Sequence, residues 1–150
     1  MKQAITPLLL VCAVLFAASC GNTGAVVVTG LRVELTGVER AADGAVSVSW
    51  RLVNPNVTSY LLAQATNRIY LNGTLVGTIV DKDPTGVPAN GSAAKTSMLT
   101  LAGPAAAKIL AAASGTASYR VESSLIIQIY GSQTEKGYLA STGTVPVVSK

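Results

Sequence analysis

Acidic and hydroxyl side chains are the first residues in this chain whose type and spacing could support chemistry. Asp81 and Asp83 flank Lys82 in a segment rich in Pro and Gly, and two such carboxylates could contact Ca²⁺ together with backbone carbonyl oxygens. No third acid stands near them in the sequence, whereas sites for hard cations collect several carboxylates. The sequence therefore favours a solvated loop over a calcium site.

The motifs that would indicate an enzyme are missing from the sequence. The chain contains no His, which removes most zinc sites and every triad that requires an imidazole. Its Ser and Thr residues form no Gly-x-Ser-x-Gly elbow, and no Walker A or dinucleotide-binding sequence occurs. We therefore expect no enzyme activity, no cofactor, no metal and no small-molecule substrate.

Charge also argues against one class of partner. The 11 Lys and Arg residues outnumber the 7 Asp and Glu residues by a small margin, and they are scattered along the chain. A nucleic-acid-binding protein would gather its cations on one face or along one helix. No nucleic-acid partner is expected.

Cys20 carries the clearest chemical signal. A largely apolar run from Ala4 to Ala17 follows Lys2 and has the form of a secretory signal peptide, since it is shorter than the roughly 20 residues of a membrane-spanning helix. The run ends in Ala17-Ala18-Ser19-Cys20, which resembles a bacterial lipobox, where cleavage precedes a Cys that receives lipid. We expect residues 1–19 to be a lipoprotein signal peptide and Cys20 to be the lipid attachment site. Conventional cleavage, with Cys20 an ordinary residue, is the alternative.

The cysteine count agrees with a lipid anchor. Cys12 lies within the apolar run and is removed with it, so Cys20 is the single Cys of the mature chain. An unpaired thiol in a secreted protein needs an explanation, and a thioether link to diacylglycerol supplies one. Gly21, rather than Asp, follows Cys20, so the expected location is the periplasmic face of the outer membrane in a Gram-negative host. Residues 20–30 would form a lipidated tether.

The rest of the chain predicts strands. Apolar residues alternate with polar ones in several short runs, which is typical of half-buried strands. We expect strands over residues 31–36, 46–53, 60–71, 75–80, 95–101, 119–130 and 138–148. The Asn72-Gly73 dipeptide between two of these runs predicts a tight hairpin, and Trp50, in series with Val48 and Leu52, is expected in the core rather than exposed for ligand stacking.

One segment breaks the strand pattern. Residues 104–113 begin with Pro, are rich in Ala and include Ile109 and Leu110, which predicts a short helix. The second strand ends at Asn54-Pro55-Asn56, where Pro leaves the ladder and the Asn side chains can bond the local backbone. One domain over residues 31–148 is expected, of all-β class with one short helix, as an antiparallel sandwich or barrel of about seven strands.

A family resemblance rests on these residues. The strand from Val46 to Val53, the Asn54-Pro55-Asn56 turn, the next strand and the Asn72-Gly73 hairpin follow one another as in the LEA14-type domain. This domain belongs to the second subgroup of late embryogenesis abundant proteins and is also called the WHy domain (water stress and hypersensitive response). The family's Asn-Pro-Asn maps onto Asn54, Pro55 and Asn56. Its helix and following strand resemble residues 104–113 and 119–130, so that the resemblance covers residues 31–147.

The resemblance implies both a fold and a function. The fold would be a fibronectin-III/immunoglobulin-like β-sandwich. The function would be that of a non-enzymatic, lipid-anchored envelope protein that protects membranes or proteins from stress such as desiccation. The alternative is a binding module or accessory subunit that docks to another membrane protein through a strand edge. The expected partners are the membrane, through lipid on Cys20, and a client or envelope protein.

Overall fold

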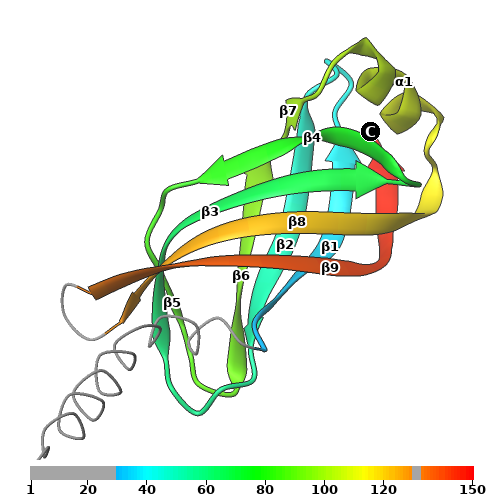
Figure 1. Ribbon diagram of the computed structural model, residues 1–150. Coiled ribbons are helices and arrows are strands. Elements are labelled where there is room, and N and C mark those ends of the chain that lie inside the picture. Colours follow the sequence, from blue (N-terminus) through cyan, green and yellow to red (C-terminus); the bar gives the residue numbers. More distant parts are fainter. Residues whose placement is uncertain (1–29, 130–132) are drawn as a thin grey trace, which may run out of the picture.

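The computed structural model describes residues 30–129 and 133–150, most of which lie in strands (Figure 1). Along the chain the elements are β1 (Arg32–Arg40), β2 (Val46–Asn54), β3 (Tyr60–Leu71), β4 (Thr74–Asp81), β5 (Thr85–Val87), β6 (Gly91–Met98), β7 (Thr100–Leu101), α1 (Pro104–Ala112), β8 (Gly115–Ile129) and β9 (Gln133–Ser149). The predicted signal peptide, Cys20 and most of the tether lie outside the described residues.

A single sheet curls into two layers. Its strands follow the order β6-β2-β1-β9-β8-β3-β4-β7, and β5 pairs with β3. Figure 1 shows β3, β4 and β8 running across β1, β2 and β6, so that the two ends of the sheet face each other. The pairing is antiparallel except between β1 and β9, where Val38 to Arg40 run parallel to Val147 to Ser149. The sheet is therefore mixed.

The curled sheet closes at one end through a bend at Leu99. Strands β6 and β7 are consecutive segments of chain, yet β6 pairs with β2 and β7 pairs with β4. The chain thus crosses from one layer to the other at Leu99, whose N–H donates to the carbonyl of Val46 over 2.8 Å. Gly77 permits this crossing because a Cβ there would lie 2.8 Å from Cγ of Leu99 and still closer to the carbonyl oxygen of Thr100.

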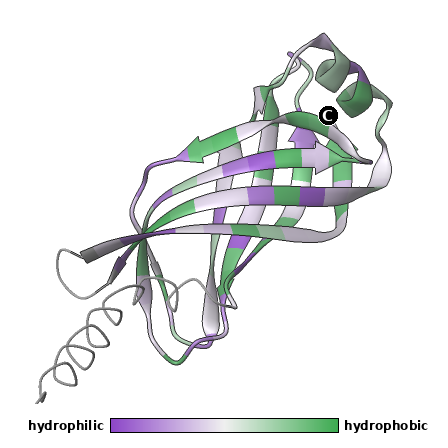
Figure 2. Ribbon diagram, viewed as in Figure 1, coloured by the Kyte–Doolittle hydropathy of each residue, from purple (hydrophilic) through white to green (hydrophobic). Residues whose placement is uncertain are grey.

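The core lies between the two layers. Hydrophobic and hydrophilic residues alternate along the strands (Figure 2), as the period of two requires when one face is buried. In β2 the buried apolar side chains are Val46, Val48, Trp50 and Leu52. In α1, Ala106 and Leu110 are buried and Ile109 packs partly against the core, so the helix covers one end of the sandwich.

These observations confirm the predicted class, which is all-β with one short helix. The helix starts at Pro104 as expected and ends at Ala112. The expected strand over residues 95–101 is divided by the bend at Leu99, and the stretch expected to be loop contains the short strand β5. The last strand begins at Gln133, before the expected Tyr138. The differences have one cause, since alternation in a sequence does not report bends or pairing partners.

The Asn72-Gly73 hairpin forms as predicted. Both residues have positive φ, 48° and 82°, as a two-residue type I′ turn requires. Asn72 adds a tertiary contact, because its side-chain oxygen accepts hydrogen bonds from the N–H and the hydroxyl of Ser118 at 3.1 and 3.0 Å. The turn therefore also fixes the start of β8.

Two polar side chains occupy the core opposite each other. Asn67 of β3 and Ser123 of β8 are paired residues in the sheet, and both are buried. Neither polar atom of the Asn67 amide nor the Ser123 hydroxyl has a hydrogen-bond partner among the described residues.

Candidate functional site

The Asn-Pro-Asn sequence forms a hydrogen-bonded junction at the end of β2. The side chain of Asn54 is fully buried, and its Nδ2 donates to the carbonyls of Thr58 and Pro88 at 2.8 and 3.0 Å. Its Oδ1 accepts from the N–H of Asn56 at 3.0 Å. One amide thus joins the β2–β3 loop to the segment before β6.

The same junction continues through Asn56 and presents one apolar side chain to solvent. The carbonyl of Asn56 accepts from the N–H of Asn90 over 2.9 Å. Val57, which follows, is 85% exposed. Asn54 itself cannot reach a client, because every polar atom of its side chain is already bonded to backbone inside the protein.

We expect Asn54→Ala to lower the free energy of unfolding by about 1–3 kcal/mol, because it removes the hydrogen bonds of the buried Asn54 amide to backbone groups of Thr58, Pro88 and Asn56. Pro55→Ala, in the same turn, removes no hydrogen bond and is expected to cost about 1 kcal/mol or less. Urea midpoints of the two purified variants check the prediction. Equal midpoints would show that the amide contributes no more than the ring of Pro55.

A second polar group joins the two edges of the curled sheet. The indole N–H of Trp50 donates to the hydroxyl of Ser97 over 3.2 Å, and that hydroxyl donates to Oδ2 of Asp81 over 3.2 Å. Lys95 forms an ion pair of 2.6 Å with Oδ1 of Asp81, and its Nζ also donates to the carbonyl of Asp83 over 2.8 Å. Since Asp81 ends β4 while Lys95 and Ser97 belong to β6, side chains bridge edges that the backbone leaves unpaired.

The expectation of a solvated loop is wrong for Asp81. Its side chain is 8% exposed and that of Lys95 is 13% exposed. Burial alone raises the pKa of the Asp81 carboxyl, but hydrogen bonds from Lys95, the Asp83 N–H and Ser97, with the positive charge of Lys95, hold that pKa below its ordinary value of 3.8. Asp83 takes part through its backbone, since its N–H donates to Asp81 and its carbonyl accepts from Lys95.

The outer face of the sheet carries a third polar group, on β3 and β8. The carboxylate of Glu122 accepts from Nη1 of Arg68 at 3.3 Å and from the hydroxyl of Tyr70 at 3.1 Å. Arg120 lies 2.8 Å from the other carboxylate oxygen. Both guanidinium groups also lie over the Tyr70 ring, that of Arg120 at 4.2 Å and that of Arg68 at 5.7 Å from its centre.

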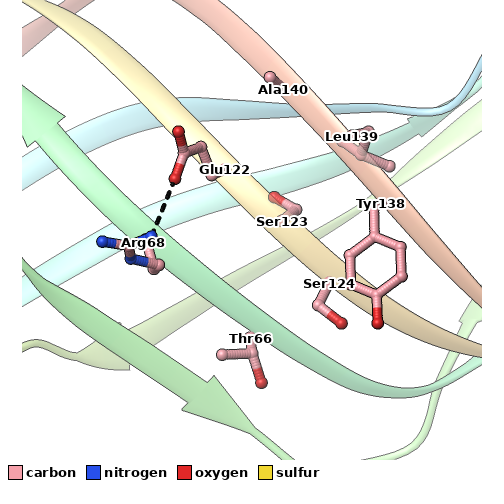
Figure 3. A pocket seen from close by; sticks show the side chains of 8 residues that line it. All are labelled: Thr66, Arg68, Glu122, Ser123, Ser124, Tyr138, Leu139 and Ala140. Atoms are coloured by element: carbon pink, nitrogen blue, oxygen red, sulfur yellow. Dashed lines mark hydrogen bonds and ion pairs between the residues drawn. The ribbon is translucent and has the colours of Figure 1, made fainter.

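A groove of about 520 Å³ lies beside this group, across β3, β8 and β9. Figure 3 shows Arg68 and Glu122 on one side of it, the ring of Tyr138 on the other, and Thr66 and Ser124 between them. Its lining residues are Thr66, Arg68, Glu122, Ser123, Ser124, Tyr138, Leu139 and Ala140. The sequence did not predict this groove, because its residues are far apart in the chain and meet only through strand pairing.

The predicted lipid site, Cys20, lies outside the described residues. The described chain starts at Gly30, where a Cβ would lie 3.2 Å from Cγ of Pro55. No helix among the described residues is long and apolar enough to cross a membrane. The same residues hold no cluster of three or more side chains that could bind a metal ion.

Two solved structures share this arrangement of strands. The solution structure of AT1g01470 from Arabidopsis thaliana matches with a TM-score of 0.51 and 16% identity, over 78% of this chain and 78% of that one. The solution structure of At2g46140.1, assigned as a late embryogenesis abundant (LEA) protein, matches with a TM-score of 0.50 and 12% identity, over 81% of this chain and 74% of that one. The chain has a LEA14-type fold.

At these identities the comparison concerns the LEA14-type fold alone. No protein-family model and no curated protein matches the sequence. Asn54 is the last residue of β2, and Pro55 and Asn56 lie in the loop before β3. The three polar groups described above lie at separate places: the junction at the end of β2, the bridge between β4 and β6, and the outer face of β3 and β8.

Proposed function

We propose that this protein is a non-enzymatic, lipid-anchored protein of the cell envelope that protects membranes or proteins during desiccation. The observation that carries the proposal is a LEA14-type fold in a chain whose first twenty residues resemble a lipoprotein signal ending at Cys20. The absence of His from the sequence supports the non-enzymatic part, because it removes the commonest general base.

The fold limits how protection would work. Its core is assembled from nearly every strand, so the domain is folded before any stress and would act through contacts of its surface. Two or three acyl chains on Cys20, each buried CH₂ contributing about 0.8 kcal/mol, would hold it stably on a bilayer. Residues 20–30 could extend over roughly 33 Å, which leaves the sandwich free to contact lipid or neighbouring proteins.

The anchor is tested by labelling cells with radioactive palmitate. The wild-type protein should incorporate label and enter the detergent phase, whereas Cys20→Ser should do neither. Cys12→Ser is the matched control, because it changes a thiol within the segment that cleavage removes and should label like wild type. Label retained by Cys20→Ser would contradict the lipid anchor.

Protection is tested separately by drying. Lipid vesicles carrying a trapped dye, and a drying-sensitive enzyme in solution, would be dried and rehydrated with the wild-type protein or an equal mass of serum albumin. We expect less dye leakage or more recovered enzyme activity with the wild-type protein. Equal results with albumin on both readouts would contradict a protective function, whatever the labelling experiment shows.

A binding module is the second candidate, and one observation favours it. Strand β9 pairs with β8 over most of its length, but with β1 only at Val147 to Ser149. The remaining edge of β9 has no strand partner among the described residues, and such an edge can add a strand from another protein. A stoichiometric partner that cross-links to β9 in intact membranes would favour this candidate over desiccation protection.

A further inference from the structure

The groove on the outer face has the dimensions of a small-molecule site. Its volume of about 520 Å³ falls within the range of about 300–1,000 Å³ that is usual for ligand pockets. Its residues lie on three neighbouring strands rather than on loops. Pairing fixes the backbone of these residues, so the strands that form the groove are in place before a ligand arrives.

One side of the groove is fixed and rich in donors. Three groups donate to the carboxylate of Glu122: Arg68, Tyr70 and Arg120. The carboxylate is therefore largely satisfied. Arg68 uses one nitrogen in this contact, and a guanidinium has five N–H donors in all. The other N–H groups of Arg68, which lines the groove, are available to an acceptor.

The other side of the groove is an aromatic ring. Tyr138 is 79% exposed, which makes its ring the most exposed large aromatic surface among the described residues. It lies across from Ser124, and Ser124 lies across from Thr66. The ring is thus two strand spacings, or roughly 10 Å, from the strand that carries Arg68, with two hydroxyl side chains between them (Figure 3).

The strands beneath the groove and the charges beside it argue against a peptide strand as the ligand and in favour of an anion. Strand β3 pairs with β4 and β8, and β8 pairs with β3 and β9, so both strands have their backbone groups in ladders and offer none to an added peptide strand. Arg68 and Glu122 line the groove, and Arg120 lies beside it without lining it; together these three side chains carry a net positive charge, which favours an anion.

We propose that this groove binds an acidic saccharide of about two pyranose rings, a length that matches the roughly 10 Å between β9, which carries Tyr138, and β3, which carries Arg68. The C–H face of one pyranose stacks on Tyr138. The face of the aromatic ring is electron-rich and attracts the weakly positive C–H hydrogens of the sugar. The sugar carboxylate accepts a charge-assisted pair of hydrogen bonds from Arg68. Ser124 and Thr66 bond the ring hydroxyls between these two contacts.

The test is a titration of the lipidated protein, labelled with ¹⁵N and held in detergent micelles, followed by amide chemical shifts. Digalacturonic acid is the probe, and galactobiose, which has the same linkage but no carboxylates, is the neutral comparison. We expect saturable shifts centred on Ser124 and Ala140 with the acidic sugar at millimolar concentration. Binding of galactobiose should be at least tenfold weaker.

Two variants and a control make the proposal falsifiable. Tyr138→Ala should weaken digalacturonate binding at least tenfold, and Arg68→Gln should remove the preference for the acidic sugar. Met98→Ala, which also truncates a large exposed side chain but on β6, should bind like wild type. No saturable shifts, or equal binding by Tyr138→Ala and wild type, would overturn the proposal. Equal affinity for galactobiose would overturn the assignment of an acidic ligand. Neither result bears on lipid labelling or drying protection.

Discussion

Trp50→Ala is expected to lower the free energy of unfolding by about 3–5 kcal/mol, the usual loss for truncating a buried aromatic side chain. Trp50 has no exposed surface, so the change would leave a cavity between the layers. The change also removes the indole N–H that donates to Ser97, and so weakens the polar bridge between β4 and β6. Urea denaturation of the purified protein provides the measurement.

The neighbouring residue gives a matched control for Trp50. Ser49 points to the opposite face of β2, where its hydroxyl forms an exposed hydrogen bond of 3.0 Å with Thr96. Ser49→Ala should cost less than about 0.5 kcal/mol, as is usual for surface substitutions. Equal urea midpoints for the two variants would mean that the register of β2 is wrong or that the Trp50 side chain is exposed.

The contrast between Trp50 and Ser49 shows how much of the fold the sequence could predict. Each strand that alternates strongly was predicted, because burial of one face imposes a period of two. The Asn72-Gly73 turn was predicted because few residue pairs adopt positive φ twice in succession. The bend at Leu99 was not predicted. It depends on Gly77, a residue of another strand, whose missing Cβ makes room for the crossing.

The polar sites were less predictable than the fold, for a related reason. Asn54 bonds mostly to nearby backbone, so its chemistry could be foreseen from the local turn. Asp81 finds its partner Lys95 across the opening of the sheet, and Arg68 finds Glu122 on a strand 54 residues away. Such partners are set by which strands pair and in which register, and alternation alone contains neither.

The Asp81–Lys95 pair gives the second large expected effect. Lys95→Met should lower the free energy of unfolding by about 2–3 kcal/mol at neutral pH. This lies between the cost of losing an exposed ion pair and that of leaving a buried charge uncompensated. The physical cause is Asp81, whose side chain is 8% exposed in the wild type and whose negative charge would lose its partner. Lys82→Met is the matched control, since it removes the same charge from an exposed neighbour of Asp81.

The pH dependence separates a lost ion pair from lost packing. In the wild type the folded pKa of Asp81 is below its ordinary value of 3.8, so its contribution is complete above that value and is lost as the pH falls through the folded pKa. In Lys95→Met, burial without the lysine would raise that pKa, and protonation would then relieve the unpaired charge. The stability difference between wild type and Lys95→Met should therefore be largest near pH 7. It should shrink as the pH falls through the raised pKa of the variant and then through the wild-type pKa, which lies below 3.8. Urea midpoints measured across this range should show no such narrowing for Lys82→Met, and a constant difference for Lys95→Met would mean that Lys95 acts through its methylene groups.

The double variant Asp81→Asn with Lys95→Met should recover part of the loss at pH 7, because it removes the unpaired charge while the edges of β4 and β6 stay in place.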